Sequence, residues 1–266
     1  MKSLVGVLAC VLWAGPVSAA VRTEPIEYRD GETALQGYIA YDDASTDKRP
    51  GVLVVHEWKG LGPYAIRRAE QLARLGYVAM AVDMYGKGVR AKDHEEAGKL
   101  SGIYRKDRAL TRSRIRAALN VLKANEFVDP GRIAAIGYCF GGMAVLELAR
   151  SGADILGVVT FHGALDTPNP EDAKQITCKV LVLHGANDGY ITQEQVAAFE
   201  REMREAGVDY QLIQYPGAVH SFTVREAGDN PAAGAAYDKA ADEQSWEQMK
   251  AFFQKLFSPS ELERIG

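Results

Sequence analysis

Gly137-Tyr138-Cys139-Phe140-Gly141-Gly142 lies between two apolar runs of this 266-residue chain, residues 132–136 and 143–150. The first run is typical of a buried strand and the second of a helix. A strand that turns into a helix through Gly-x-nucleophile-x-Gly needs small flanking residues, because a Cβ there would collide with neighbouring elements. This turn would hold Cys139 over the positive end of a helix. The alternative is a buried core cysteine beside a glycine-rich helix start.

The composition is that of an ordinary globular protein, with 47% hydrophobic residues, 25% charged residues and a formal net charge of -4. No Lys/Arg cluster indicates nucleic-acid binding, so no nucleic-acid partner is expected. Lys2, an apolar stretch over residues 4–15 and small residues up to Ala20 predict a secretory signal peptide over residues 1–19. The stretch is too short for a transmembrane helix, which needs about 20 residues; a retained membrane anchor is the alternative. We predict cleavage after Ala19 or Ala20 and a periplasmic or secreted protein, free of the membrane.

Two cysteines, Cys139 and Cys178, would remain after removal of the signal peptide, which contains Cys10. An oxidising compartment makes a Cys139–Cys178 disulfide one alternative. A disulfide needs Cα atoms within about 7 Å of each other, and Cys178 opens an apolar run that predicts a strand over residues 179–184. We therefore expect Cys178 to be a core thiol.

Residues 20–266 are predicted to form a single α/β domain. Alternating segments at 24–28 and 34–41 flank Asp30-Gly31-Glu32 and predict an antiparallel hairpin. Continuous apolar runs then alternate with helical patterns, which indicates a mostly parallel sheet with helices on both faces. Ligands bind such sheets beyond the carboxyl ends of the strands. The expected strands cover 51–55, 77–82, 132–136, 155–161, 179–184 and 209–215, and the expected helices cover 64–75, 106–125, 143–150 and 236–257.

A nucleophilic cysteine needs a base and a group that orients the base. His220 follows the expected strand that ends at residue 215 and is the candidate base. Asp188 follows the strand over 179–184 and is the candidate orienting acid, with Asp166 as the alternative. The order nucleophile, acid, histidine is that of α/β-hydrolases. Two other histidines stand at strand ends before glycines and are expected to make core hydrogen bonds: His162 and His184.

Glu57 stands at the end of the first core strand, in a loop that normally donates one oxyanion-hole amide. We expect the backbone N–H groups of Trp58 and Phe140 to bind a developing oxyanion. A carboxylate beside Cys139 would raise the pKa of the thiol and oppose thiolate formation. That would protect the sulfur in an oxidising compartment, because oxidation follows thiolate character. A solvent-facing loop glutamate is the alternative.

Five segments stand in order along the chain: His56-Glu57-Trp58-Lys59-Gly60, Asp83-Met84-Tyr85-Gly86, Gly137 to Gly142, Gly185-Ala186-Asn187-Asp188 and His220-Ser221-Phe222. Together they resemble the dienelactone hydrolase family, and the resemblance covers about residues 26–257. It implies an α/β-hydrolase fold, a Cys139/Asp188/His220 triad, Glu57 in contact with the resting thiol, and hydrolysis of an ester or enol-lactone through an acyl-cysteine. No metal or organic cofactor is needed for that chemistry.

The chain departs from this family in its anion-binding residues and its export signal. Characterised members are cytosolic and hold the substrate carboxylate with two arginines, one near the loop after the tyrosine and one four residues beyond the histidine. Here the second position is Val224. We expect a monomer that acts on small esters or lactones; a generalist carboxylesterase and a non-catalytic binding or thiol-redox protein are the alternatives. The candidate substrate-binding residues are Tyr85, Lys87, Arg90 and Arg225, and plain solvated charge is the alternative for the last three.

Overall fold

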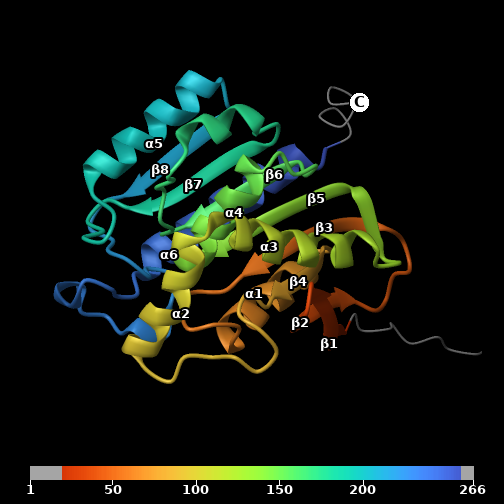
Figure 1. The fold of residues 1–266 in the computed structure, drawn as a ribbon. Helices are drawn as coiled ribbons and strands as arrows, with labels where there is room; N and C mark the ends of the chain where they lie inside the picture. The colour runs from red at the N-terminus through yellow and green to blue at the C-terminus, as the bar shows by residue number, and fades with distance from the viewer. Residues whose placement is uncertain (1–19, 259–266) are drawn as a thin grey trace, which may run out of the picture.

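One mixed sheet organises the protein (Figure 1). The structure, a computed structural model, describes residues 20–258, and the expected signal peptide over residues 1–19 lies outside this range. Eight strands of the described range form the sheet in the order β1-β2-β4-β3-β5-β6-β7-β8. The hairpin of β1 (Val21–Asp30) and β2 (Thr33–Asp42) is antiparallel, as is the β2–β4 pair, and all other pairs are parallel. The parallel strands are β3 (Arg49–Val55), β4 (Val78–Val82), β5 (Val128–Tyr138), β6 (Gly157–Phe161), β7 (Lys179–Gly185) and β8 (Tyr210–Tyr215).

Helices cover both faces of the sheet, and the alternation of side chains along β3 shows how. Val52 and Val54 face a core shared with α1 (Pro63–Arg74) and α6 (Lys239–Leu256). Leu53 and Val55 face the opposite core, which contains side chains of α3 (Arg108–Lys123), α4 (Phe140–Arg150) and α5 (Gln193–Ala206). Because both faces are buried, the central strands are apolar throughout. The described range also contains α2 (His94–Lys106) and short 3-10 turns at Pro170–Gln175, Arg225–Ala227 and Pro231–Ala233.

The predicted fold class and the N-terminal hairpin are confirmed, but two helices were not predicted. Helix α5 carries clear local signals, since Thr192 and Gln195 form a capping box and Gly207 ends the helix at a φ of 71°. Helix α2 is capped by the Asp93 side chain but contains two glycines, which weaken the helical pattern. In addition, α4 begins at Phe140 rather than at residue 143, directly after Cys139.

Buried ion pairs anchor α4 to its neighbours. The Arg150 guanidinium donates to Glu202 of α5 at 2.8 and 2.9 Å and to Glu147 at 3.2 Å, and all three residues are buried. Glu147 also accepts from Arg112 of α3. Breaking one partner of such a buried pair is strongly destabilising, so these bonds hold the helix that starts at Cys139 firmly against α3 and α5.

Candidate active site

Cys139 occupies a strained turn between β5 and α4. Its φ of 53° and ψ of -112° lie in a region that residues other than glycine rarely adopt. The flanking glycines permit this close packing. A Cβ at Gly137 would lie 2.0 Å from the Gly141 carbonyl oxygen, and one at Gly141 would lie 2.4 Å from the Val55 oxygen. The strand–cysteine–helix turn expected from the sequence is therefore formed, with the cysteine at the carboxyl end of the sheet.

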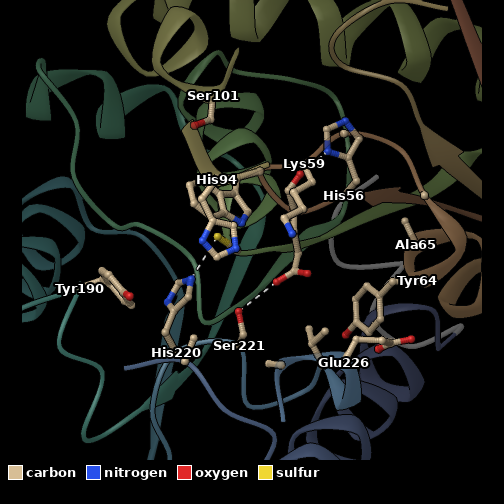
Figure 2. A pocket seen from close by; sticks show the side chains of 18 of the residues that line it. His56, Lys59, Tyr64, Ala65, His94, Ser101, Tyr190, His220, Ser221 and Glu226 are labelled. Atoms are coloured by element: carbon tan, nitrogen blue, oxygen red, sulfur yellow. Dashed lines mark hydrogen bonds between the residues drawn. The ribbon is translucent and has the colours of Figure 1, made fainter. Parts of the chain in front are cut away.

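Three side chains from separate loops meet at this turn. The Cys139 Sγ lies 3.1 Å from His220 Nε2, and His220 Nδ1 lies 2.8 Å from Asp188 Oδ2. The other oxygen of Asp188 accepts the backbone N–H groups of Tyr190 at 2.8 Å and Ile191 at 3.3 Å. Figure 2 shows His220 reaching toward the sulfur. The structure thus brings together the three residues that the sequence proposed as nucleophile, acid and base.

The surroundings of His220 favour its protonated form. Burial by itself lowers the pKa of His220, but the negative charge on Cys139 and hydrogen bonds with Asp188 and Cys139 raise it well above its ordinary value. A raised histidine pKa means that the imidazolium persists to higher pH than in water. Because Asp188 accepts from Nδ1, the other ring nitrogen faces the sulfur. The arrangement therefore favours a protonated imidazole ring beside the Cys139 sulfur.

Glu57 lies in the same cavity but does not hold the sulfur. Its carboxylate accepts a hydrogen bond from the Ser221 hydroxyl at 3.1 Å, its only hydrogen bond within residues 20–258. Burial raises the pKa of Glu57, while the charge of His220 and the bond from Ser221 act in the opposite direction. The expected contact between Glu57 and the thiol is not formed, because the sulfur turns to His220 and Ser221, at a φ of 58°, turns to Glu57.

The loop after β3 is held in place and leaves one amide free. His56 Nδ1 donates to the Glu57 carbonyl at 2.5 Å, and its Nε2 accepts from the Met84 N–H at 3.3 Å. Burial lowers the pKa of His56 to about 4, so the ring is neutral. The Tyr85 hydroxyl donates to the Trp58 carbonyl at 2.9 Å. The Trp58 N–H itself makes no hydrogen bond in the described part of the chain.

The second free amide belongs to Phe140, in the first turn of α4. The first amides of a helix have no intrahelical partner, and no hydrogen bond of the Phe140 N–H is formed within residues 20–258. Both amides proposed for an oxyanion are therefore available to a ligand. Two unpaired N–H groups at this position are suited to bind the negative charge that develops on an oxygen beside Cys139.

A cavity of about 1000 Å³ opens over Cys139 and His220, and only one of the candidate substrate-binding residues lines it. Arg90 does so. Tyr85 is buried beneath the loop, Lys87 pairs with Glu27 of β1 at 2.5 Å, and Arg225 stacks on the Tyr237 ring. These three side chains do not line the cavity and each contacts another part of the protein, so their contact with substrate stays a prediction. Cationic lining residues that the sequence did not single out are Lys59, Arg67 and Arg105.

The contacts of Asp166 and Cys178 bear on two further alternatives from the sequence. Asp166, the alternative acid, pairs with Arg108 at 2.9 Å. Cys178 is a buried free thiol whose pKa burial raises to about 12, and no disulfide joins it to Cys139.

The two other strand-end histidines differ from each other. His162 Nε2 bonds to the Thr223 hydroxyl at 2.8 Å, and its ring packs edge-on against that of His220. Burial lowers the pKa of His162 well below its ordinary value, so the ring that packs against His220 is uncharged. The ring of His184 is buried but its two nitrogens make no hydrogen bond within the described residues, so the expected core bond is absent there.

Residues 20–258 contain no group of three or more His, Cys, Asp or Glu side chains that is arranged to hold a metal ion. Within the same range, no helix is both long enough and apolar enough to cross a bilayer.

The parallel sheet, the strained turn and the order of the elements define an α/β-hydrolase fold. Residues 35–257 match the dienelactone hydrolase family, and the chain belongs to that family. The resemblance inferred from the sequence is confirmed.

Individual relatives support this placement. The crystal structure of a dienelactone hydrolase-like promiscuous phosphotriesterase from metagenomic libraries is 41% identical, with a TM-score of 0.86, covering 91% of this chain and 100% of that one. A protein of Aquifex aeolicus that bears the name "Putative carboxymethylenebutenolidase" is 27% identical over 233 residues, 86% of this chain and 96% of that protein. The chain is accordingly a hydrolase of the dienelactone hydrolase type.

Proposed function

We propose that the protein is an exported, monomeric hydrolase that cleaves small carboxylic esters or enol-lactones through an acyl-Cys139 intermediate. The observation that carries this proposal is a pair of contacts made by His220. Its Nε2 lies 3.1 Å from Cys139 Sγ, and its Nδ1 lies 2.8 Å from Asp188 Oδ2. The signal-like segment from Lys2 to Ala20 supports export.

The geometry supports a two-step acyl transfer. The Cys139 thiolate attacks the carbonyl carbon, and the electron pair of the C=O bond moves to oxygen, where the Trp58 and Phe140 amides stabilise it. The tetrahedral intermediate collapses, and the imidazolium of His220 gives its proton to the departing oxygen. His220 then removes a proton from water, the hydroxide attacks the thioester, and the acid leaves as the Cys139 thiolate re-forms. Asp188 stabilises the imidazolium throughout.

The lining of the cavity bears on the choice between lactone and ester. Val224 lines the cavity at the position where characterised members carry an arginine, whereas Arg90 and Arg105 supply positive charge elsewhere on the wall. The missing arginine favours neutral esters, and a generalist carboxylesterase is therefore the second candidate. A 41% identical relative is a promiscuous phosphotriesterase, so a phosphotriester is a further candidate substrate.

The test is a comparison of kcat/KM for a carboxylate-bearing enol-lactone, a neutral aryl ester and a phosphotriester. The proposal predicts turnover of both the enol-lactone and the aryl ester, each lost in a Cys139→Ala variant. Turnover of aryl esters alone would favour the generalist carboxylesterase. Turnover of neither carbonyl substrate would contradict the proposed function.

We further propose that Glu57 gates the thiol by opposing thiolate formation before substrate arrives. Its carboxylate shares the cavity with Cys139, and like charges in a buried site disfavour each other. In a Glu57→Gln variant, alkylation of Cys139 by iodoacetamide at neutral pH should accelerate by up to about tenfold, the change that one pKa unit gives. Peptide mapping separates Cys139 from Cys178.

Glu226→Gln is the matched control for the Glu57 variant. Glu226 also lines the cavity, but it is exposed and paired with Arg67 at 2.5 Å. Alkylation of Cys139 in this variant should stay close to the wild-type rate, because salt and water screen an exposed charge. An unchanged or slower rate in Glu57→Gln, or an equal acceleration in both variants, would remove Glu57 from this role.

A further inference from the structure

One face of α2 forms a wall of the cavity. His94, Gly98, Ser101 and Arg105 all line it, and their spacing of four, three and four residues places them on the same side of the helix. Figure 2 shows Ser101 and His220 on opposite sides of the site. In the proposed reaction His220 must reach the departing oxygen, so the leaving group lies on the His220 side. The acyl group is then directed toward α2.

Gly98 leaves this wall open at its middle. Glycine inside a helix is about 1 kcal/mol less favourable than alanine. Nothing in the local structure requires it, because its φ is not positive and a Cβ there would meet no atom within 4 Å. The space that a side chain at this position would occupy belongs to the cavity. A larger residue would therefore narrow the cavity without disturbing the packing of α2.

The two ends of the wall differ in chemistry. At one end the ring of Trp58 packs on that of His94, with centroids 5.3 Å apart. At the other end Arg105 has an exposed side chain that forms no ion pair within the described residues. At a rise of about 1.5 Å per residue, His94 and Arg105 lie about 16 Å apart along the helix. Between these two ends the wall consists of Gly98 and the buried Ser101. The Ser101 hydroxyl already donates its hydrogen bond to the Ala97 carbonyl.

The size of the cavity also exceeds what a small lactone needs. A volume of about 1000 Å³ lies at the upper end of the range for pockets that hold drug-sized ligands. An aromatic ring placed over Gly98 would have the rings of Trp58 and His94, tilted by 40° to each other, beside it. Aromatic rings pack favourably in offset or edge-on contacts.

We propose that this face of α2 is the acyl-group subsite and that Gly98 sets its size, so that the enzyme accepts aromatic acyl groups. The inference deepens the proposed function and rests on it, because an acyl group is positioned only if Cys139 carries one. The substrate class is therefore esters of aromatic carboxylic acids, in addition to small aliphatic ones.

The test compares Gly98→Leu with Gly102→Leu on p-nitrophenyl acetate and p-nitrophenyl benzoate, which share a leaving group. Gly102 is the matched control, because it lies in the same helix, a Cβ there also meets nothing within 4 Å, and it does not line the cavity. Gly98→Leu should lower kcat/KM for the benzoate by tenfold or more. A difference of one methylene group in an apolar pocket commonly changes kcat/KM by about this factor. It should change the acetate value less than about threefold, and Gly102→Leu should leave the ratio of the two substrates unchanged.

The other possible results contradict either the acyl-group subsite or the proposed function itself. Equal losses on both esters, or the same ratio in both variants, would overturn the subsite. So would a loss that follows the size of the alcohol, measured with phenyl acetate and 2-naphthyl acetate, because the wall would then hold the leaving group. Gly98→Ala adds only a methyl group and should give a smaller change in the same direction. It tests the subsite even if the leucine variant does not fold. A wild-type enzyme that cleaves neither ester would contradict the proposed function itself, whereas an active enzyme with unchanged selectivity contradicts only the subsite.

Discussion

Cys139→Ala is expected to lose about 10⁴-fold or more in kcat on an activated aryl ester while it keeps its fold. Removing a triad nucleophile commonly has an effect of this size, because only binding and the oxyanion hole remain to accelerate the reaction. Here the sulfur is the atom that faces His220 Nε2 at 3.1 Å, and no other thiol of residues 20–258 lines the cavity. Alanine removes the sulfur and leaves the backbone turn with a side chain no larger than before.

Cys178→Ala is the control for the loss of a thiol as such. Cys178 is buried and free, and it does not line the cavity. Its replacement should leave kcat near the wild-type value, with a modest loss of thermal stability from the deleted core sulfur. Wild-type turnover in Cys139→Ala, or equal losses in the two variants, would show that Cys139 is not the nucleophile.

Asp188→Asn is expected to lower kcat by about 10³- to 10⁴-fold, the effect seen when a triad carboxylate is exchanged for an amide. The carboxylate accepts from His220 Nδ1 at 2.8 Å, and this bond helps to raise the pKa of His220. An amide NH₂ in the same place would donate to Nδ1 and favour the tautomer with its proton on Nε2, which cannot accept the thiol proton. The amide oxygen can still accept the Tyr190 N–H, so the loop should stay in place.

A second readout separates this role from a structural one. With the Asp188 bond weakened, the pKa of His220 falls, and the thiolate–imidazolium pair is less populated at neutral pH. Alkylation of Cys139 should therefore slow in Asp188→Asn. Asp166→Asn, which weakens only the half-exposed pair with Arg108, should retain both kcat and the alkylation rate. Comparable losses in the two aspartate variants would speak against Asp188 as the residue that orients His220.

The parts of the site that could be predicted from the sequence are those encoded locally. The glycines around Cys139 are required by contacts that a Cβ would make, such as 2.0 Å at Gly137, so the motif itself indicates the turn. Asp188 and His220 each follow a strand, and the parallel order of β5, β7 and β8 brings the ends of those strands to one edge. Chain order and strand position together were therefore sufficient to select them.

The contacts that could not be predicted depend on placement between distant segments. Ser221 has a φ of 58°, which turns its side chain away from that of the preceding histidine, His220. Only for this reason does the Ser221 hydroxyl contact Glu57. Lys87 was expected near substrate, but the β1–β2 hairpin brings Glu27 to it. Arg105 could not be predicted as a cavity residue, because the two glycines of α2 weaken the helical pattern of the segment that carries it.

The most direct test of the central claim is the mass of the enzyme quenched during turnover of p-nitrophenyl acetate. The proposed mechanism predicts a species heavier by one acetyl group, with the acetyl mapped to the peptide that contains Cys139. The adduct should be removed by hydroxylamine, as a thioester is, and be absent from Cys139→Ala. An acetyl group found on a different side chain during productive turnover, or Cys139→Ala that still forms the adduct, would contradict the account.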